Sequence, residues 1–226
     1  MIDLLKAPEF GQVEYENRDV VILCEGKDEA AVIRRMLPKE SGWKCGRAQN
    51  KQGEEAEIKA IKDAAELHFW SLVLCLVFDA EEDREVRQQQ IAGWLVNAGF
   101  VTIPVEGEFA ETPNDPEDPT RGRVCVGYLI DPPKAKSGKL EDMFLPQIAD
   151  SSYSECAEAF ATCAKAKGSK QHEEKLLLRS FIACHNAYNT TIHIGLQDRL
   201  FDLKDKAFDV LRDFLKEAER IQANLT

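Results

Sequence analysis

Two groups of acidic residues stand directly after runs that have the composition of buried β-strands, and this pairing constrains the fold more than any other feature of the chain. The first run, residues 20–24 (VVILC), is followed by EGKDE, and the second, residues 72–78 (LVLCLVF), is followed by DAEED. A continuous apolar run is typical of a parallel strand covered by helices on both faces. We therefore predict an α/β fold with a mostly parallel central sheet.

The carboxyl ends of parallel strands meet at one edge of a sheet, and the ligands of open α/β sheets collect there. Like charges packed at that edge repel one another unless a cation neutralises them. Carboxylate oxygen and water are the ligands that Mg²⁺ and Mn²⁺ prefer. The two acidic groups therefore predict a divalent-metal site at the ends of two neighbouring strands.

The rest of the chain separates into an alternating part and a helical part. From residue 20 to residue 131, strand-like and helix-like patterns alternate, as they do in βαβ units. This part is predicted to hold helices at 29–37, 54–67 and 82–98, strands at 100–105 and 123–130, and an exposed loop at 106–123. Downstream, the hydrophobic spacing predicts helices at 140–148, 153–166, 172–185 and 199–221. The expected organisation is an N-terminal extension (1–17), an α/β core (18–150) and a helical C-terminal extension packed on the core (151–226).

Composition and charge narrow the class of protein. The 226 residues are 44% hydrophobic and 31% charged, and they contain neither a membrane-spanning run nor a signal-peptide pattern. We therefore expect a cytoplasmic globular protein without membrane contact. The seven cysteines form no C-x-x-C pair, so neither zinc nor disulfides are expected. The net charge of −11 argues against broad adhesion to nucleic acid, but it does not exclude an enzyme that acts on nucleic acid at a metal site.

Three motifs stand in the same order as in a known metal-binding module. They are EGKDE at 25–29, DAEED at 79–83 and GKLED at 138–142. This order resembles the Toprim domain, which topoisomerases, bacterial primases and several nucleases share. The similarity covers most of the chain and extends to small stand-alone Toprim proteins related to the OLD (overcoming lysogenization defect) nucleases and to a ribosomal RNA maturase. It implies a Toprim-like, Rossmann-like sheet flanked by helices.

The resemblance also implies a set of metal ligands. One or two Mg²⁺ or Mn²⁺ ions would be held by the carboxylates of both strand ends, namely Glu25, Glu29, Asp79 and Glu81. Glu141 or Asp142 would complete a second metal site. The second motif departs from the family, because it reads D-A-E where many members carry aspartate twice. The longer arm of Glu81 would alter the geometry of the site.

Two metal ions close together would activate a water and stabilise the leaving oxygen in phosphodiester cleavage. Lys139, or Lys136 together with Lys134, would offset the charge on the reacting phosphate, and Lys27 would contact substrate phosphate. The expected function is therefore a metal-dependent nuclease or phosphodiesterase that acts on DNA or RNA. Its expected catalytic residues are Glu25, Asp79 and Lys139.

Simpler interpretations stay open for several of these residues. Glu25 and Asp79 would then only cap the helices that follow them, because helix N-termini favour negative charge. Helix-start chemistry likewise competes with metal ligation for Glu141 and Asp142. The histidines show no metal-ligand spacing, and the tryptophans either stack on bases or pack in the core, the latter being favoured for Trp70 and Trp94.

A different class of function also stays open. The chain would then be a non-catalytic Toprim-like module that binds nucleic acid or a partner protein and keeps the acidic site as an ion-binding or vestigial feature. The overall acidity and the D-x-E motif favour this alternative, and the complete set of three motifs disfavours it. The amphipathic C-terminal helix is expected to dock on the domain, with a homodimer as the alternative use of its apolar face. The basic stretch 44–51 would face the substrate of a nuclease.

Overall fold

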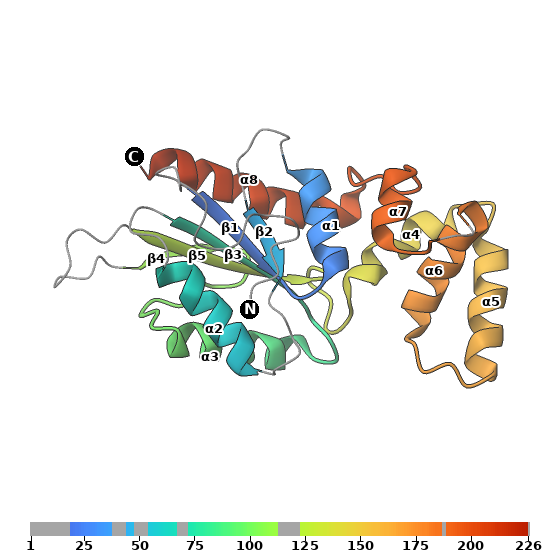
Figure 1. Cartoon of the computed structure of the whole chain (residues 1–226), viewed down its shortest axis with the longest axis horizontal. Coiled ribbons are helices and arrows are strands. Elements are labelled where there is room, and N and C mark those ends of the chain that lie inside the picture. The colour runs from blue at the N-terminus through green and yellow to red at the C-terminus, as the bar shows by residue number, and fades with distance from the viewer. Residues whose placement is uncertain are drawn as a thin grey trace.

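A five-stranded sheet forms the centre of the protein. The computed structural model describes residues 19–37, 44–47, 54–66, 72–112, 123–186 and 189–225. Within these ranges the strand order is β2-β1-β3-β5-β4 (Figure 1). β1, β2, β3 and β5 are parallel, and β4 pairs antiparallel with β5 at the edge. The strands are β1 (Asp19–Cys24), β2 (Lys44–Arg47), β3 (Leu72–Asp79), β4 (Phe109–Thr112) and β5 (Val124–Asp131).

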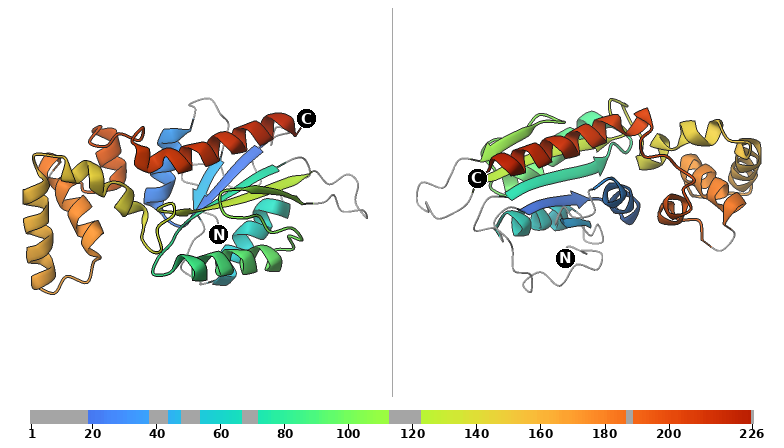
Figure 2. Two further views of the ribbon diagram at one scale, coloured as in Figure 1. Left: turned by 180° about the vertical axis from the view of Figure 1, so that it is seen from behind. Right: turned by 90° about the horizontal axis from the view of Figure 1, so that it is seen from above.

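Helices cover both faces of this sheet, so the prediction of an α/β fold with a mostly parallel sheet is confirmed. The helices α1 (Lys27–Met36) and α8 (Asp209–Asn224) lie on one face, and α2 (Glu54–Glu66) and α3 (Arg84–Asn97) lie on the other (Figures 1 and 2). Alternate side chains of β1 divide between two cores, with Ile22 facing the α1 and α8 side and Leu23 facing the α2 and α3 side. This two-sided burial explains why the strand runs are apolar throughout.

A group of helices stands beyond the end of the sheet to which the parallel strands point (Figure 2). The group consists of α4 (Leu145–Ala149), α5 (Ser154–Ala166), α6 (Glu173–His185) and α7 (Ile192–Gln197). The 3₁₀ turn η1 (Leu140–Met143) leads from the sheet into α4, and η2 (Lys206–Phe208) leads back into α8. α8 then runs along the sheet with its apolar face buried, so a homodimer through that face would have to displace the contact with the sheet.

Phe144 joins the helical group to the sheet. It is wholly buried at the junction of η1 and α4 and belongs to the core on the α1 and α8 side. Its ring meets Phe201 edge-on at 4.7 Å and Phe208 edge-on at 5.1 Å between centroids. Since Phe201 and Phe208 lie in the segments that precede α8, one side chain ties together three separate parts of the chain.

Several predicted segments differ from the structure, and the helix predicted at 140–148 is divided into η1 and α4. No strand forms at 100–105: Phe100 is buried in the core on the α2 and α3 side, but Val101 is 80% and Val105 67% exposed. The edge of β5 is instead paired with β4, which lies inside the segment predicted to be an exposed loop. The predicted helix at 199–221 begins only at Asp209, because the Asp205 side chain accepts a hydrogen bond from Ala207 N and starts a separate 3₁₀ turn.

Some predictions fall outside the described residues, and others concern the membrane and the core. The N-terminal extension 1–17 lies outside the described ranges, as do Trp43 and Trp70. Trp94 is buried on α3 and meets Phe78 edge-on at 5.3 Å, which confirms its placement in the core. Among the described helices, none is both long enough and apolar enough to cross a bilayer.

We predict that Phe144→Ala lowers the free energy of unfolding by about 3–5 kcal/mol, because it removes a fully buried ring that three segments share. Phe160→Ala is a matched control, since Phe160 is 60% exposed on α5 and should change stability by no more than about 0.5 kcal/mol. Urea unfolding followed by circular dichroism measures both. Equal losses in the two variants would contradict the role given to Phe144.

Candidate metal centre

The strand order creates a switch point between β1 and β3. From β1 the chain first adds β2 on one side and then β3 on the other, and this reversal is where ligands of open parallel sheets bind. Cys24 pairs in register with Val77, so both strands end at the same edge of the sheet. Glu25 follows β1 directly, and Asp79 is the last residue of β3.

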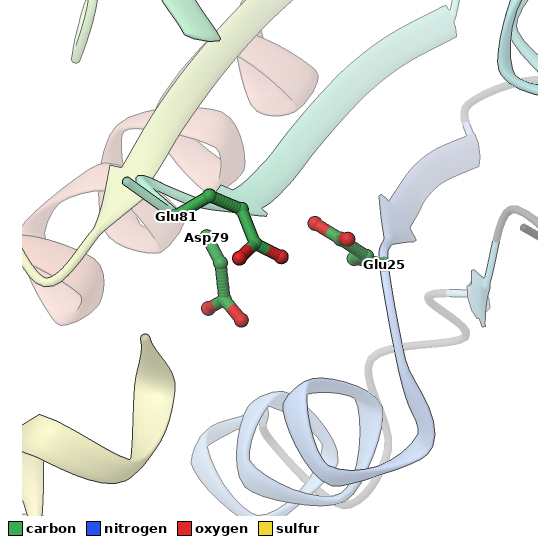
Figure 3. A group of neighbouring side chains, drawn as sticks. All are labelled: Glu25, Asp79 and Glu81. Carbon is green, nitrogen blue, oxygen red and sulfur yellow. The ribbon is translucent and has the colours of Figure 1, made fainter. Parts of the chain in front are cut away.

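Three carboxylates converge at this switch point (Figure 3). Glu25, Asp79 and Glu81 each offer an oxygen, and these oxygens all lie within 4.8 Å of one another. Within the part of the chain that the structure describes, they form the one group of three or more acidic, histidine or cysteine side chains that could hold a metal ion. We refer to Glu25, Asp79 and Glu81 as the triad. Asp79 is 6% exposed, and the two glutamates are partly buried, so the triad opens toward solvent on the glutamate side.

The backbone holds Glu81 in a conformation that few non-glycine residues adopt. Its φ of 55° lies in the left-handed region, which costs free energy and persists only where the surroundings enforce it. The enforcement comes from Gly138, because Glu81 N donates to Gly138 O at 2.9 Å and Gly138 N donates to Glu81 O at 2.8 Å. Gly138 itself has a φ of 136°, and a Cβ there would lie 2.9 Å from Pro132 Cδ. The motif glycine therefore aims the third carboxylate of the triad.

Each triad carboxylate has a donor from the chain itself. Arg87 Nη2 lies 2.6 Å from Glu25 Oε2, and Lys139 Nζ lies 2.6 Å from Glu81 Oε2. Leu140 N donates to Asp79 Oδ1 at 2.9 Å. The triad is thus partly neutralised by two cations and one backbone amide.

Arg87 is a site residue that the sequence analysis missed. It lies in the first turn of α3, whose N-cap Asp83 accepts hydrogen bonds from Glu85 N and Val86 N. Arg87 Nε donates to Asp79 O at 2.9 Å, and Arg87 Nη2 donates to the Glu25 carboxylate. Its guanidinium also stands over the rings of Phe78 and Trp94, 5.7 Å from each centroid. Arg87 therefore bridges the ends of β1 and β3 and fixes the orientation of Glu25.

Burial and the repulsion between neighbouring carboxylates make Glu25 and Asp79 hard to ionise without a further cation. Burial raises the pKa of Asp79 to about 9, and the charges of Glu29 and Glu25 add to this effect. Burial also raises the pKa of Glu25, although Arg87 opposes the shift. A divalent cation would reverse this balance, because it favours the ionised carboxylates that burial disfavours. The all-oxygen donor set therefore fits a hard divalent metal.

Glu29 lies beside the triad in a second acidic group. Burial raises its pKa to about 7, and the charges of Asp28 and Glu141 add to the shift. Its carboxylate folds back over Gly26, where a Cβ would collide with Oε2. Among the described residues this buried Oε2 has no hydrogen-bond partner. An unpaired buried oxygen facing like charges is a position where a cation would be stabilising.

The two acids of the third motif lie at the start of η1. Asp142 Oδ2 accepts a hydrogen bond from Lys139 N at 2.9 Å, so one of its oxygens caps this turn. Burial raises the pKa of Asp142, and the hydrogen bond from Lys139 N opposes the shift. Glu141 is buried and forms an ion pair with Lys175 of α6 at 3.2 Å. Neither residue is among the three carboxylates that converge, although the charge of Glu141 contributes to the raised pKa of Asp79.

The predicted lysines are spread around the site. Lys139 contacts the triad through Glu81, and although burial alone would lower its pKa, the hydrogen bond and charge of Glu81 raise it. Lys27 is exposed in the first turn of α1. Lys134 and Lys136 are exposed in the loop between β5 and η1. Of the basic stretch 44–51, the structure describes only the backbone of β2, so the side chains lie outside the description.

Arg84 and Asp131 complete the surroundings of the site, and neither was among the predicted site residues. Arg84 donates to the carbonyl oxygens of Ile130, Pro132 and Ala135 and forms an ion pair with Glu106. It therefore fixes the loop that carries the third motif. Asp131 pairs in register with Asp79. Burial, followed by the charge of Glu29, raises its pKa to about 7. Asp131 could have been found from the sequence, because it is an acidic residue at the end of a third apolar strand run.

Comparisons with known proteins identify a family without assigning an activity. The family model described as "Protein of unknown function (DUF3226)" matches residues 19–220. No curated protein and no solved structure matches the chain. The matched range includes the triad, Arg87, Lys139 and the helical group, so these features all lie within one family domain.

We predict that the metal-free protein becomes less stable as pH rises from about 5 to about 9. The folded pKa values of Glu29, Asp79 and Asp131 are raised to about 7, 9 and 7, above the ordinary carboxyl range, so the native state binds more protons than the unfolded state in this window. Their stabilising contribution is full at low pH and is lost as pH rises through the folded pKa values. Thermal unfolding in the presence of a chelator measures the trend.

Adding Mn²⁺ should raise the melting temperature more at pH 8 than at pH 5.5, because the ligands must be deprotonated to bind it. Asp79→Asn should flatten the metal-free pH dependence and remove most of the Mn²⁺ effect. A wild-type melting temperature that increases between pH 5 and pH 8 without metal would contradict the electrostatic description of this site.

Proposed function

The chain belongs to the DUF3226 family of proteins of unknown function, and from its own site we propose that it is a Toprim-like, metal-dependent nuclease that hydrolyses phosphodiester bonds of DNA or RNA. The observation that carries the proposal is the convergence of Glu25, Asp79 and Glu81 at the switch point of a parallel sheet. The order of the three motifs, which resembles the Toprim domain, supports it. The ion is proposed to be Mg²⁺ or Mn²⁺.

The triad supplies the first metal position in this proposal. Glu29, with its unpaired buried oxygen, is a candidate for a further ligand. Glu141 would join it through the oxygen that does not pair with Lys175, and Asp142 through the oxygen that does not cap η1. When bound, the metal would polarise the phosphate and lower the pKa of a bound water.

The chain's own groups have separate tasks in hydrolysis. The reaction forms a bond from water oxygen to phosphorus and breaks the bond from phosphorus to a sugar oxygen, which takes up a proton. Lys139 stays protonated because Glu81 raises its pKa, so it acts as a positive charge toward the phosphate and not as a base. Arg87 is a positioning residue that orients Glu25, and Leu140 N orients Asp79. The glutamate at position 81 has the reach to contact both Lys139 and the centre of the triad.

One observation favours the second candidate function, a non-catalytic regulatory module. Every triad carboxylate already has a donor from the chain, namely Arg87, Leu140 N or Lys139. A site of this kind can persist without any metal as a structural charge cluster. Under this alternative the protein binds nucleic acid or a partner protein, and the triad holds an ion only for stability or not at all.

The remaining parts of the proposal concern partners and location. DNA or RNA is the proposed substrate, and the cytoplasm is the proposed location, in line with the expectation from the composition. A partner protein or a homodimer is compatible with the exposed surface of the helical group. Size-exclusion chromatography with light scattering distinguishes these assemblies.

We predict that the protein cleaves plasmid DNA, single-stranded DNA or structured RNA when Mn²⁺ or Mg²⁺ is present. Glu25→Gln and Asp79→Asn should each reduce the cleavage rate by at least about 100-fold, because each removes a charge that holds the metal. Gel-based cleavage assays with and without chelator measure the effect.

Glu82→Gln is the matched control, since Glu82 is exposed one residue beyond the triad and should retain wild-type activity. Absence of cleavage in the wild type, with Mn²⁺ binding intact, would favour the regulatory alternative. Wild-type cleavage rates in both Glu25→Gln and Asp79→Asn would show that the triad is not the active site.

A further inference from the structure

The turn end of the α5–α6 hairpin carries positive charge in an otherwise acidic protein. The chain has a net charge of −11, yet residues 164–180 hold five lysines and arginines against two glutamates. Lys167 and Lys170 are exposed at the turn between the helices. The turn is built in a defined way, because Lys165 Nζ donates to Gln171 O and Arg179 Nη1 donates to Gln171 Oε1, both at 3.2 Å. The two exposed lysines are therefore presented on an ordered turn.

An aromatic stripe lies on the same hairpin. Tyr153, the residue before α5, is 42% exposed, and Phe160 is 60% exposed. Tyr153, Phe160 and Lys167 are spaced by seven residues, close to two helical turns, so they lie on one face of α5. His185 at the end of α6 contacts the Tyr153 ring edge-on at 4.6 Å. Exposed rings next to cations are typical of surfaces that stack bases and track a phosphate backbone.

The hairpin is connected to the metal centre by α6. Lys175, in the first turns of α6, forms an ion pair with Glu141 of η1. η1 also supplies Leu140 N to Asp79, so two contacts link α6 to the triad. Figures 1 and 2 place the hairpin beyond the end of the sheet to which β1, β3 and β5 point, which is the end that holds the triad.

On these observations, and resting on the proposed function, we propose that the α5–α6 hairpin is an arm that binds single-stranded nucleic acid and leads it to the metal centre. Phe160 and Tyr153 stack against bases, and Lys167 and Lys170 contact phosphates. Charge complementarity identifies the occupant, because a phosphate backbone satisfies the lysines and unpaired bases cover the rings. A base-paired duplex would leave Phe160 and Tyr153 exposed, since its bases are stacked on one another.

The test measures binding separately from cleavage. Asp79→Asn serves as the background because it prevents turnover, and the probe is a fluorescein-labelled oligo(dT) or oligo(U) strand followed by anisotropy. Phe160→Ala should weaken binding by about 5- to 150-fold, the effect of losing one stacked base. The double variant Lys167→Gln/Lys170→Gln should lower the slope of log Kd against log salt by about 1.4, or about 0.7 for each lost phosphate contact.

The control removes two charges from a different surface. Lys216 and Arg220 are exposed on α8, each paired with an acid three residues earlier, and the double variant Lys216→Gln/Arg220→Gln should bind like the background protein. Equal binding by the control, Phe160→Ala and the lysine variant would overturn the arm. A dimer in solution that dissociates on Phe160→Ala would also overturn it, because the stripe would then be a contact between two copies.

The two proposals fail in different ways. If the wild type shows no cleavage while Phe160→Ala and the lysine variant weaken binding as expected, the nuclease proposal is wrong and the proposed binding role of the hairpin is supported. If the wild type cleaves, and the hairpin variants bind and cleave normally, the binding role of the hairpin is wrong and the nuclease proposal is supported.

Discussion

Carboxylates buried together at the ends of β1 and β3 repel one another, and the other contacts of the site offset this repulsion. The apolar strands continue to Cys24 and Phe78, so Glu25 and Asp79 enter the protein at a point where water is already scarce. Burial disfavours their charged forms and each acid makes its neighbour harder to ionise, which is the reason for the raised pKa of Asp79. Each of these carboxylates has a contact that offsets the cost of burying its charge. Arg87 forms an ion pair with Glu25, Leu140 N donates to Asp79, and Lys139 forms an ion pair with Glu81.

This repulsion also explains why the third motif stands where it does. Gly138 forms two backbone hydrogen bonds with Glu81, and Lys139 forms an ion pair with the Glu81 carboxylate. Leu140 N donates a hydrogen bond to Asp79. Its aspartate caps the turn that holds these groups in place, and its glutamate connects the turn to α6. The main role of the third motif in the structure is therefore to hold the acidic side chains of the other two motifs in position. Arg84 extends this support by donating to the carbonyl oxygen of Ile130 in β5 and to two carbonyl oxygens, of Pro132 and Ala135, in the loop before the motif.

The sequence predicts the parts of this site that depend on local pattern. Apolar runs that end in acids identify β1 and β3, and because their ends meet at one edge, the sequence also indicates that Glu25 and Asp79 lie close together. Arg87 could not be found in this way, since its partner Glu25 lies 62 residues away and an arginine in the first turn of a helix has no distinctive pattern. The predicted strand at 100–105 was wrong because pairing at a sheet edge is decided by competition, and β4 occupies that edge. The role of Asp142 was left open because capping and metal ligation use the same residue type at the same place.

Isothermal titration of the metal-free protein with Mn²⁺ decides whether the triad holds a divalent cation. We expect saturable binding that is lost in Asp79→Asn and Glu81→Gln, retained in Glu82→Gln, and accompanied by proton release when buffers of different ionisation enthalpy are compared. Binding that is equally strong in all four proteins, or no binding to any of them, would contradict this expectation and would leave the triad as a charge cluster balanced by Arg87 and Lys139 alone.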